Sequence, residues 1–116
     1  MERKFGCAEL NGVKVYNTTQ HTIQFFSSNG EVWLEIHRAS EPLQMPEIDK
    51  FCGTLEGIPL FSKLFAGDYL PSPRDDVYFV VSNDVATIFR RKDFLVPYGV
   101  EESEGVINCI GLAFID

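Results

Sequence analysis

The sequence predicts a single α+β domain of mostly antiparallel β-sheet, built from hairpins, with one short α-helix after a buried central strand. Three observations predict this class. Runs of alternating apolar and polar residues recur along the chain, and this period of two is typical of strands with one buried face. An Asn-Gly pair separates two such runs. A run of five apolar residues leads directly into helix-capping residues.

Size and composition fit one folded domain. The chain has 116 residues, of which 45% are hydrophobic. A chain of this length can bury roughly two-thirds of the surface that it exposes when unfolded, which is enough for one core. Ten phenylalanines, four tyrosines and a tryptophan argue against disorder. The sequence contains no long linker, so residues 1–116 are predicted to form a single domain.

The first part of the chain predicts a hairpin. Val13–Tyr16 alternates as a short strand does, and so do Thr22–Phe26 and Glu31–Ile36. Ser27–Gly30 lies between the last two runs and ends in Asn-Gly, whose residues tolerate positive φ. We therefore expect these two strands to pair through a tight turn.

The middle of the chain is interrupted by prolines. Arg38–Glu47 contains two of them and is predicted as a loop or edge. Phe51–Phe65 regains strand character around Glu56-Gly57. Pro59 lies inside this segment and has no N–H for a ladder, so at least one of its strands is expected to be an edge or to carry a bulge. Gly67–Asp76 is predicted as a connector.

Val77–Val81 is predicted as the central strand, because a strand that is apolar at every position is buried on both faces. Ser82, Asn83 and Asp84 follow as good helix-capping residues. The helix that they begin has three apolar residues at spacings of three and four: Val85, Ile88 and Phe89.

The end of the chain predicts a last hairpin. Phe94–Pro97 forms its first strand, Glu101–Gly105 its tip and Val106–Ile115 its return strand. The large apolar residues exceed what one small core requires, so some are expected to face a partner or a second copy of the chain.

Charge excludes two classes of partner. The formal net charge is −7 and the sequence pI is about 4.7. Neutralising phosphates requires clustered lysines and arginines, and the sequence has one such cluster, Arg90-Arg91-Lys92. Direct nucleic-acid binding and adhesion to an anionic membrane are therefore not expected. The acidic excess could instead attract a basic partner.

The cysteines and the beginning of the chain predict a cytoplasmic protein. Cys7, Cys52 and Cys109 stand far apart, without a CxxC pair. The first residues lack the apolar region of a signal peptide, and no apolar run reaches the roughly 20 residues that span a bilayer. We expect reduced thiols that pack as small hydrophobic side chains.

His21, with Asn17 beside it in N-T-T-Q-H, is the weak candidate for a catalytic residue. A histidine acts as a general base when a carboxylate, nucleophile or metal accompanies it, and the spacing identifies no such partner. The alternative is local: the Asn and Thr side chains bind nearby backbone groups and set a turn at the beginning of a strand. The histidines and cysteines show no metal-ligand spacing, so no metal is predicted.

A second candidate site would bind a ligand. Ser82 and Asn83 lie where the helix is predicted to begin, and free N–H groups there favour an anion, although self-capping is the alternative. Arg90 and Arg91, together with Arg74, are the predicted cationic residues for a nucleotide-like ligand or an acidic partner. The glycine-rich patterns that hold phosphates are absent from the sequence, so no cofactor is predicted.

The order of several motifs resembles a small family of uncharacterised proteins of bacteria and their phages, whose opening reads N-L-T-P-H-x-I. The matching segments are N-T-T-Q-H-T-I at 17–23, E-G-I-P-L at 56–60, L-P-S-P-R at 70–74, V-Y-F-V-V-S-N-D-V-A at 77–86, R-K-D-F-L-V-P at 91–97 and G-V-I-N-C-I-G-L-A at 105–113. Gln20 stands where the family has proline. Residues 1–15 precede this resemblance and look like an added N-terminal strand or extension.

The resemblance implies a setting rather than a chemistry: a small accessory protein of prokaryotes or phages. Together with the weak catalytic signals, it favours a non-enzymatic binding protein that inhibits a host defence factor or sequesters a small signalling molecule. The alternatives are a small hydrolase or nucleotide-processing enzyme that uses His21, and a structural or assembly component of a virion. The expected partners are a host or phage protein or a small nucleotide-like ligand, and the protein could form a homo-oligomer.

Overall fold

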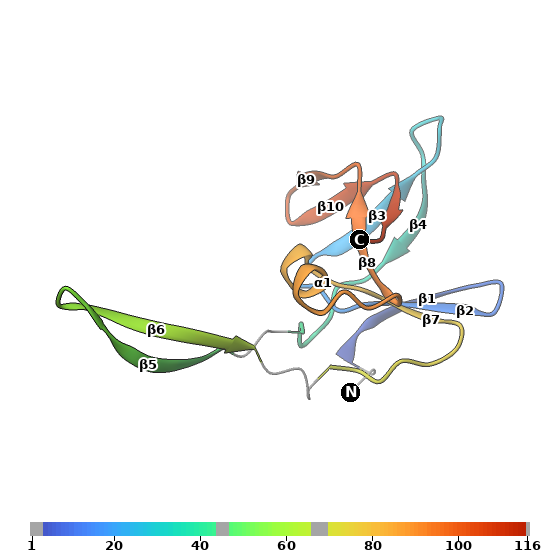
Figure 1. Ribbon diagram of the computed structural model, residues 1–116. Helices are drawn as coiled ribbons and strands as arrows, with labels where there is room; N and C mark the ends of the chain where they lie inside the picture. The colour runs from blue at the N-terminus through green and yellow to red at the C-terminus, as the bar shows by residue number, and fades with distance from the viewer. Residues whose placement is uncertain (1–3, 44–46, 66–69, 116) are drawn as a thin grey trace.

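The computed structural model describes residues 4–43, 47–65 and 70–115, and these residues form two β-sheets, a separate β-hairpin and one short helix (Figure 1). The five-stranded sheet has the order β1-β2-β7-β8-β11, and the four-stranded sheet has the order β4-β3-β10-β9. The strands of the first sheet are β1 (Gly6–Leu10), β2 (Val13–Asn17), β7 (Val77–Val80), β8 (Phe94–Tyr98) and β11 (Gly111–Ala113). Those of the second are β4 (Val32–Ile36), β3 (Thr22–Phe26), β10 (Val106–Cys109) and β9 (Glu101–Ser103).

The β3–β4 hairpin confirms the prediction made from its Asn-Gly turn. The Gly30 N–H donates to the Ser27 carbonyl at 2.9 Å, and the Ser27 N–H donates to Glu31 at 2.8 Å. Gly30 has φ of 83°, which glycine adopts without a steric penalty. This is a three-residue loop in which a left-handed residue follows a type I turn.

The sheets are more mixed than the predicted stack of antiparallel hairpins. Among the described residues, five strand pairs are antiparallel, but β2–β7, β7–β8 and β3–β10 are parallel. Parallel neighbours need crossover connections. The short helix supplies the crossover between β7 and β8, whereas β2–β7 and β3–β10 join segments that are distant in the sequence. Alternation of apolar residues identifies a strand but does not identify its neighbour.

The predicted last hairpin is correct only in part: β8 pairs antiparallel with the end of the return segment, but the rest of that segment pairs elsewhere. The return segment is divided at Ile110 into β10 and β11. Strand β10 pairs with β3 and β9 in one sheet, whereas β11 pairs with β8 in the other. The chain therefore changes sheets at this point, and the Ile110 N–H donates to the Tyr98 carbonyl at 3.1 Å beside the break.

Strand β7 lies in the middle of the five-stranded sheet and is buried on both faces. Its side chains alternate between two cores, as a period of two requires. Phe79 packs with Val85 of helix α1 (Asn83–Phe89) on one face. Val80 packs with Ile23 of the four-stranded sheet on the other face. The five-stranded sheet is therefore covered by the helix on one side and by the second sheet on the other.

Strands β5 (Glu47–Leu55) and β6 (Ile58–Phe65) form a hairpin of their own, away from both sheets (Figure 1). Its turn is Glu56-Gly57, with φ of 50° and 85°, the two positive values of a type I′ turn. The register shifts between Phe51 and Gly53, which confirms the bulge or edge expected from Pro59. The hairpin begins at Glu47, earlier than predicted. Because of it the molecule is elongated, with extents of 59 × 30 × 27 Å.

Candidate functional site

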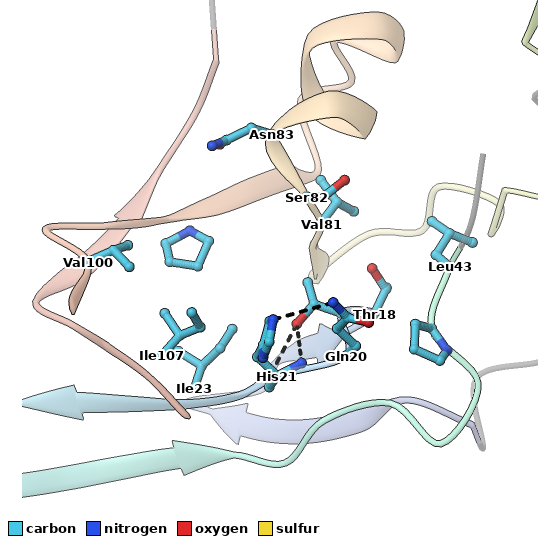
Figure 2. A pocket seen from close by; sticks show the side chains of 13 residues that line it. Thr18, Gln20, His21, Ile23, Leu43, Val81, Ser82, Asn83, Val100 and Ile107 are labelled. Atoms are coloured by element: carbon cyan, nitrogen blue, oxygen red, sulfur yellow. Dashed lines mark hydrogen bonds between the residues drawn. The ribbon is translucent and has the colours of Figure 1, made fainter. Parts of the chain in front are cut away.

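A pocket of about 490 Å³ lies where the turn between β2 and β3, the beginning of α1 and the chain after β8 meet (Figure 2). Thirteen residues line it: Thr18, Thr19, Gln20, His21, Ile23, Pro42, Leu43, Val81, Ser82, Asn83, Pro97, Val100 and Ile107. Figure 2 shows His21 on the strand side of the pocket and Asn83 on the helix side. His21, Ser82 and Asn83, which belonged to two separate candidate sites in the sequence, therefore share one pocket.

Asn17 is completely buried and holds the turn that forms the floor of this pocket. Its Nδ2 donates to the His21 carbonyl at 2.9 Å and to the Ile36 carbonyl at 3.2 Å. Its Oδ1 accepts from the Thr19 N–H at 3.0 Å and from Thr19 Oγ1 at 2.7 Å. Each amide hydrogen and the oxygen therefore have partners. Asn17 contacts the backbone of His21 rather than its imidazole, which is the structural role set out as the alternative.

Thr18 connects the same turn to the five-stranded sheet. Its side chain is almost completely buried, and Oγ1 donates to the Val80 carbonyl at 2.8 Å. The Thr18 N–H donates to the same carbonyl at 3.0 Å. The turn is thereby tied to the end of β7, immediately before the residues that cap α1.

The His21 ring is oriented by two neutral groups. Nδ1 lies 3.1 Å from the Gly105 carbonyl, and Nε2 lies 3.4 Å from Nε2 of Gln20. A carbonyl only accepts hydrogen bonds, so Nδ1 carries the proton, and Nε2 accepts from the Gln20 amide. Neither partner is a carboxylate of the kind that orients a catalytic histidine. The contact with Gly105 instead joins the turn to the β9–β10 tip.

Ser82 acts as the cap of α1. Its Oγ accepts from the Val85 N–H at 3.3 Å, which satisfies one of the unpaired donors of the first turn. This is the self-capping role set out in the sequence analysis. Asn83 is exposed at the rim of the pocket. Its side-chain amide can donate a hydrogen bond to a bound molecule and can accept one from it.

The lining combines hydrogen-bonding groups with an apolar wall. Ile23, Ile107 and Val100 lie together in Figure 2, opposite the side of Leu43. None of the lining residues that the structure describes is Asp, Glu, Lys or Arg. The pocket thus offers neutral polar contacts beside hydrocarbon and has no formal countercharge for an ion.

The predicted cationic residues lie elsewhere. Arg90 and Arg91 border a second hollow of about 460 Å³, together with Tyr78, Lys92, Phe114 and Ile115. Arg74 is exposed in the loop before β7 and is not part of this lining. The structure therefore divides the predicted ligand-binding set: Ser82 and Asn83 line the first pocket, Arg90 and Arg91 border the second hollow, and Arg74 lines neither.

The Arg91 guanidinium is paired with other groups of the protein. Nε and Nη2 donate to the two carboxylate oxygens of Asp93 at 2.9 and 2.6 Å, and Nη1 donates to the Pro71 carbonyl at 2.7 Å. The guanidinium carbon also lies 4.3 Å from the centre of the Phe94 ring. Arg90 caps the helix with φ of 43°, and its Nε donates to the Thr87 carbonyl at 3.1 Å. These contacts favour structural roles over phosphate binding.

Sequence reasoning missed the apolar wall of the pocket. Pro42, Pro97, Val100 and Ile107 come from different segments of the chain, and none belongs to a recognisable binding motif. The parallel β3–β10 pair, which local sequence patterns do not show, is what brings Ile107 beside Ile23 in this wall. The polar residues could be found because they lie next to each other in N-T-T-Q-H and S-N-D.

Fold and site together define a small, β-rich protein with one short helix and a neutral pocket of ligand size. No protein-family model, curated protein or solved structure matches the chain. Within residues 4–43, 47–65 and 70–115, no three histidine, cysteine or acidic side chains gather as a metal site. The helix in this part of the chain is too short and too polar to cross a membrane. Function must therefore be argued from the pocket itself.

Proposed function

We propose that the protein is a non-enzymatic binding protein that sequesters a small, uncharged molecule in the pocket beside His21 and Asn83, in the cytoplasm of a prokaryotic host. The observation that carries this proposal is the lining: polar side chains without formal charge face an apolar wall. A volume of about 490 Å³ lies within the range of small-molecule sites. Such sites are mostly apolar, with a few polar groups that fix orientation.

The same lining narrows the chemistry of the ligand. A phosphate or carboxylate would find no cationic side chain here, and the net charge of −7 would repel it further. An uncharged molecule with a hydrogen-bonding edge and an apolar flank fits better. Neutral heterocycles and nucleosides have both features, whereas nucleotides carry a charge that this pocket does not match.

Binding is better supported than catalysis. Both nitrogens of His21 contact neutral groups, Gly105 and Gln20, and Ser82 Oγ is committed to the helix cap. Nucleophilic catalysis needs a hydroxyl or thiol within hydrogen-bond reach of a base that a third group orients. Sequestration of a small molecule is also favoured over inhibition of a host protein through a large contact surface, because the site is concave.

Calorimetry with a panel of neutral heterocycles and nucleosides tests the proposal, with their phosphorylated forms as comparison. We expect saturable binding of a neutral compound, weakened by Asn83→Ala because the rim amide is lost. The matched control is Thr87→Ala, an exposed residue of the same helix outside the lining. Equal binding by both variants, or a preference for the phosphorylated compounds, would contradict the assignment of this pocket. Turnover of a bound compound that His21→Ala abolishes without a change in stability would favour the enzyme.

A further inference from the structure

The β5–β6 hairpin exposes an unusual amount of hydrocarbon for an element with no core of its own. Five of its large apolar side chains are each more than two-fifths exposed: Phe51, Leu55, Ile58, Leu60 and Phe61. The hairpin forms a sheet by itself and makes its extensive contacts within itself. An isolated two-stranded hairpin is at best marginally stable in water, and it needs a further surface on which to pack.

The apolar side chains lie on both faces of this hairpin. Phe51 is opposite Phe61 in the register, and their ring centroids are 5.8 Å apart. Leu60 follows in the alternate position on β6 and therefore points to the other face. Leu55 and Ile58 are paired near the turn. Folding of one chain cannot cover both faces of a ribbon that stands away from the two sheets (Figure 1).

The surface area shows how much surface is left to bury. A compact monomer of 13.1 kDa is expected to expose about 6,400 Å², and the chain exposes 7838 Å². The surplus of about 1,400 Å² exceeds the roughly 800 Å² per partner that a standard stable interface buries. The chain as a whole therefore exposes enough surplus surface for a dimer interface, and the hairpin is the element that stands away from both sheets.

Charge indicates which surface of a second copy is compatible. The whole chain carries a formal charge of −7, so two bodies repel each other. The hairpin itself, residues 47–65, contains three acidic residues and two lysines, a formal charge of −1, so the rest of the chain carries −6. The surface that meets this hairpin with least repulsion is thus another copy of the same hairpin.

We propose that the β5–β6 hairpin is a dimerisation arm that packs face to face on the same arm of a second copy. The contact is isologous, since the same patch serves on both chains, and it closes as a two-fold dimer. The acidic bodies remain at the outer ends. This inference is independent of the ligand proposal, because no residue that lines the pocket belongs to the arm.

Sedimentation velocity over a range of concentrations tests the arm. We expect the full chain to sediment as a dimer of twice 13.1 kDa. Phe61→Glu and Ile58→Glu lie on opposite faces of the arm, and the one on the face that packs on the partner should weaken dimerisation by about 30-fold or more, as for a central interface residue. The matched control is Phe114→Glu, since Phe114 is 59% exposed and Phe61 62%. It should remain dimeric, and circular dichroism should show that all variants are folded.

Three results would overturn the proposal. The first is a monomeric full chain at all concentrations, which would leave the arm free for a different partner. The second is a dimer that persists in both arm variants. The third is dissociation by Phe114→Glu to the same degree, because the interface would then include the body.

Discussion

Replacing Asn17 with alanine should destabilise the protein strongly, although Asn17 is polar and does not itself line the pocket. The change removes four hydrogen bonds and leaves the Ile36 carbonyl, in the buried core, without this donor. A hydrogen bond contributes about 1 kcal/mol net, and an unsatisfied buried group costs about 1–3 kcal/mol. Three of the four bonds are only partly buried, and Thr19 Oγ1 can still donate to the His21 carbonyl at 3.1 Å. We therefore expect a loss of about 2–4 kcal/mol in the free energy of unfolding.

Urea denaturation at constant ionic strength measures this loss, and a thermal melt should show a fall of about 8–16 °C, at about 4 °C per kcal/mol for a chain of this size. Asn83→Ala is the matched control, since it removes the same amide from an exposed position and should change stability by about 0.5 kcal/mol or less. A loss below about 1 kcal/mol for Asn17→Ala would refute the reasoning. It would mean that water or the remaining hydroxyls replace the amide, so that the turn does not depend on it.

Three further predictions concern other parts of the fold. Burial raises the pKa of the Cys109 thiol, so the folded state keeps this proton to higher pH than the unfolded chain. The free energy of unfolding should therefore be unaffected by this group below about pH 9 and should fall as pH rises further, and Cys109→Ala should remove that part of the slope. Gly6→Ala should cost about 1–3 kcal/mol, because a Cβ there would lie 1.8 Å from the His37 carbonyl oxygen, whereas Gly111→Ala meets no atom within 4 Å and serves as control in the same melts. Arg91→Lys should lower stability by about 1.5–3 kcal/mol in urea titrations, because an ammonium group cannot reproduce the bidentate pair; an unchanged midpoint would contradict the structural role.

The sequence predicted features formed by residues that are close together in the chain better than features formed by residues that are far apart. Turn chemistry is local, so Asn29-Gly30 and Glu56-Gly57 were both located correctly. The unbroken apolar run of β7 predicted burial on both faces because each face has its own core. The parallel pairing of β3 with β10 joins residues more than 80 positions apart, and alternation carries no information about such a neighbour. The division of the last strand at Ile110 follows from that pairing and was missed with it.

The candidate site divides in the same way. Ser82 was identified from its position before a helical pattern, and it does cap α1. The predicted cationic set stays a prediction, although Arg91 is held by Asp93 two residues away, a local contact that favours a structural role for this arginine. The apolar part of the pocket could not be predicted, since Pro42 and Ile107 come to line the same pocket only in the folded chain.

N-T-T-Q-H shows that the structural and functional interpretations of a polar cluster need not compete. Asn17 and Thr18 are buried and direct their polar atoms at the backbone, which fixes the turn. Because the turn is fixed, His21 and Gln20 lie on its outer side, in the lining of the pocket. The partner that orients the His21 ring is the Gly105 carbonyl, 84 residues away, so no spacing rule could have found it. The buried half of the motif therefore supports the exposed half, which lines the pocket proposed to hold a ligand.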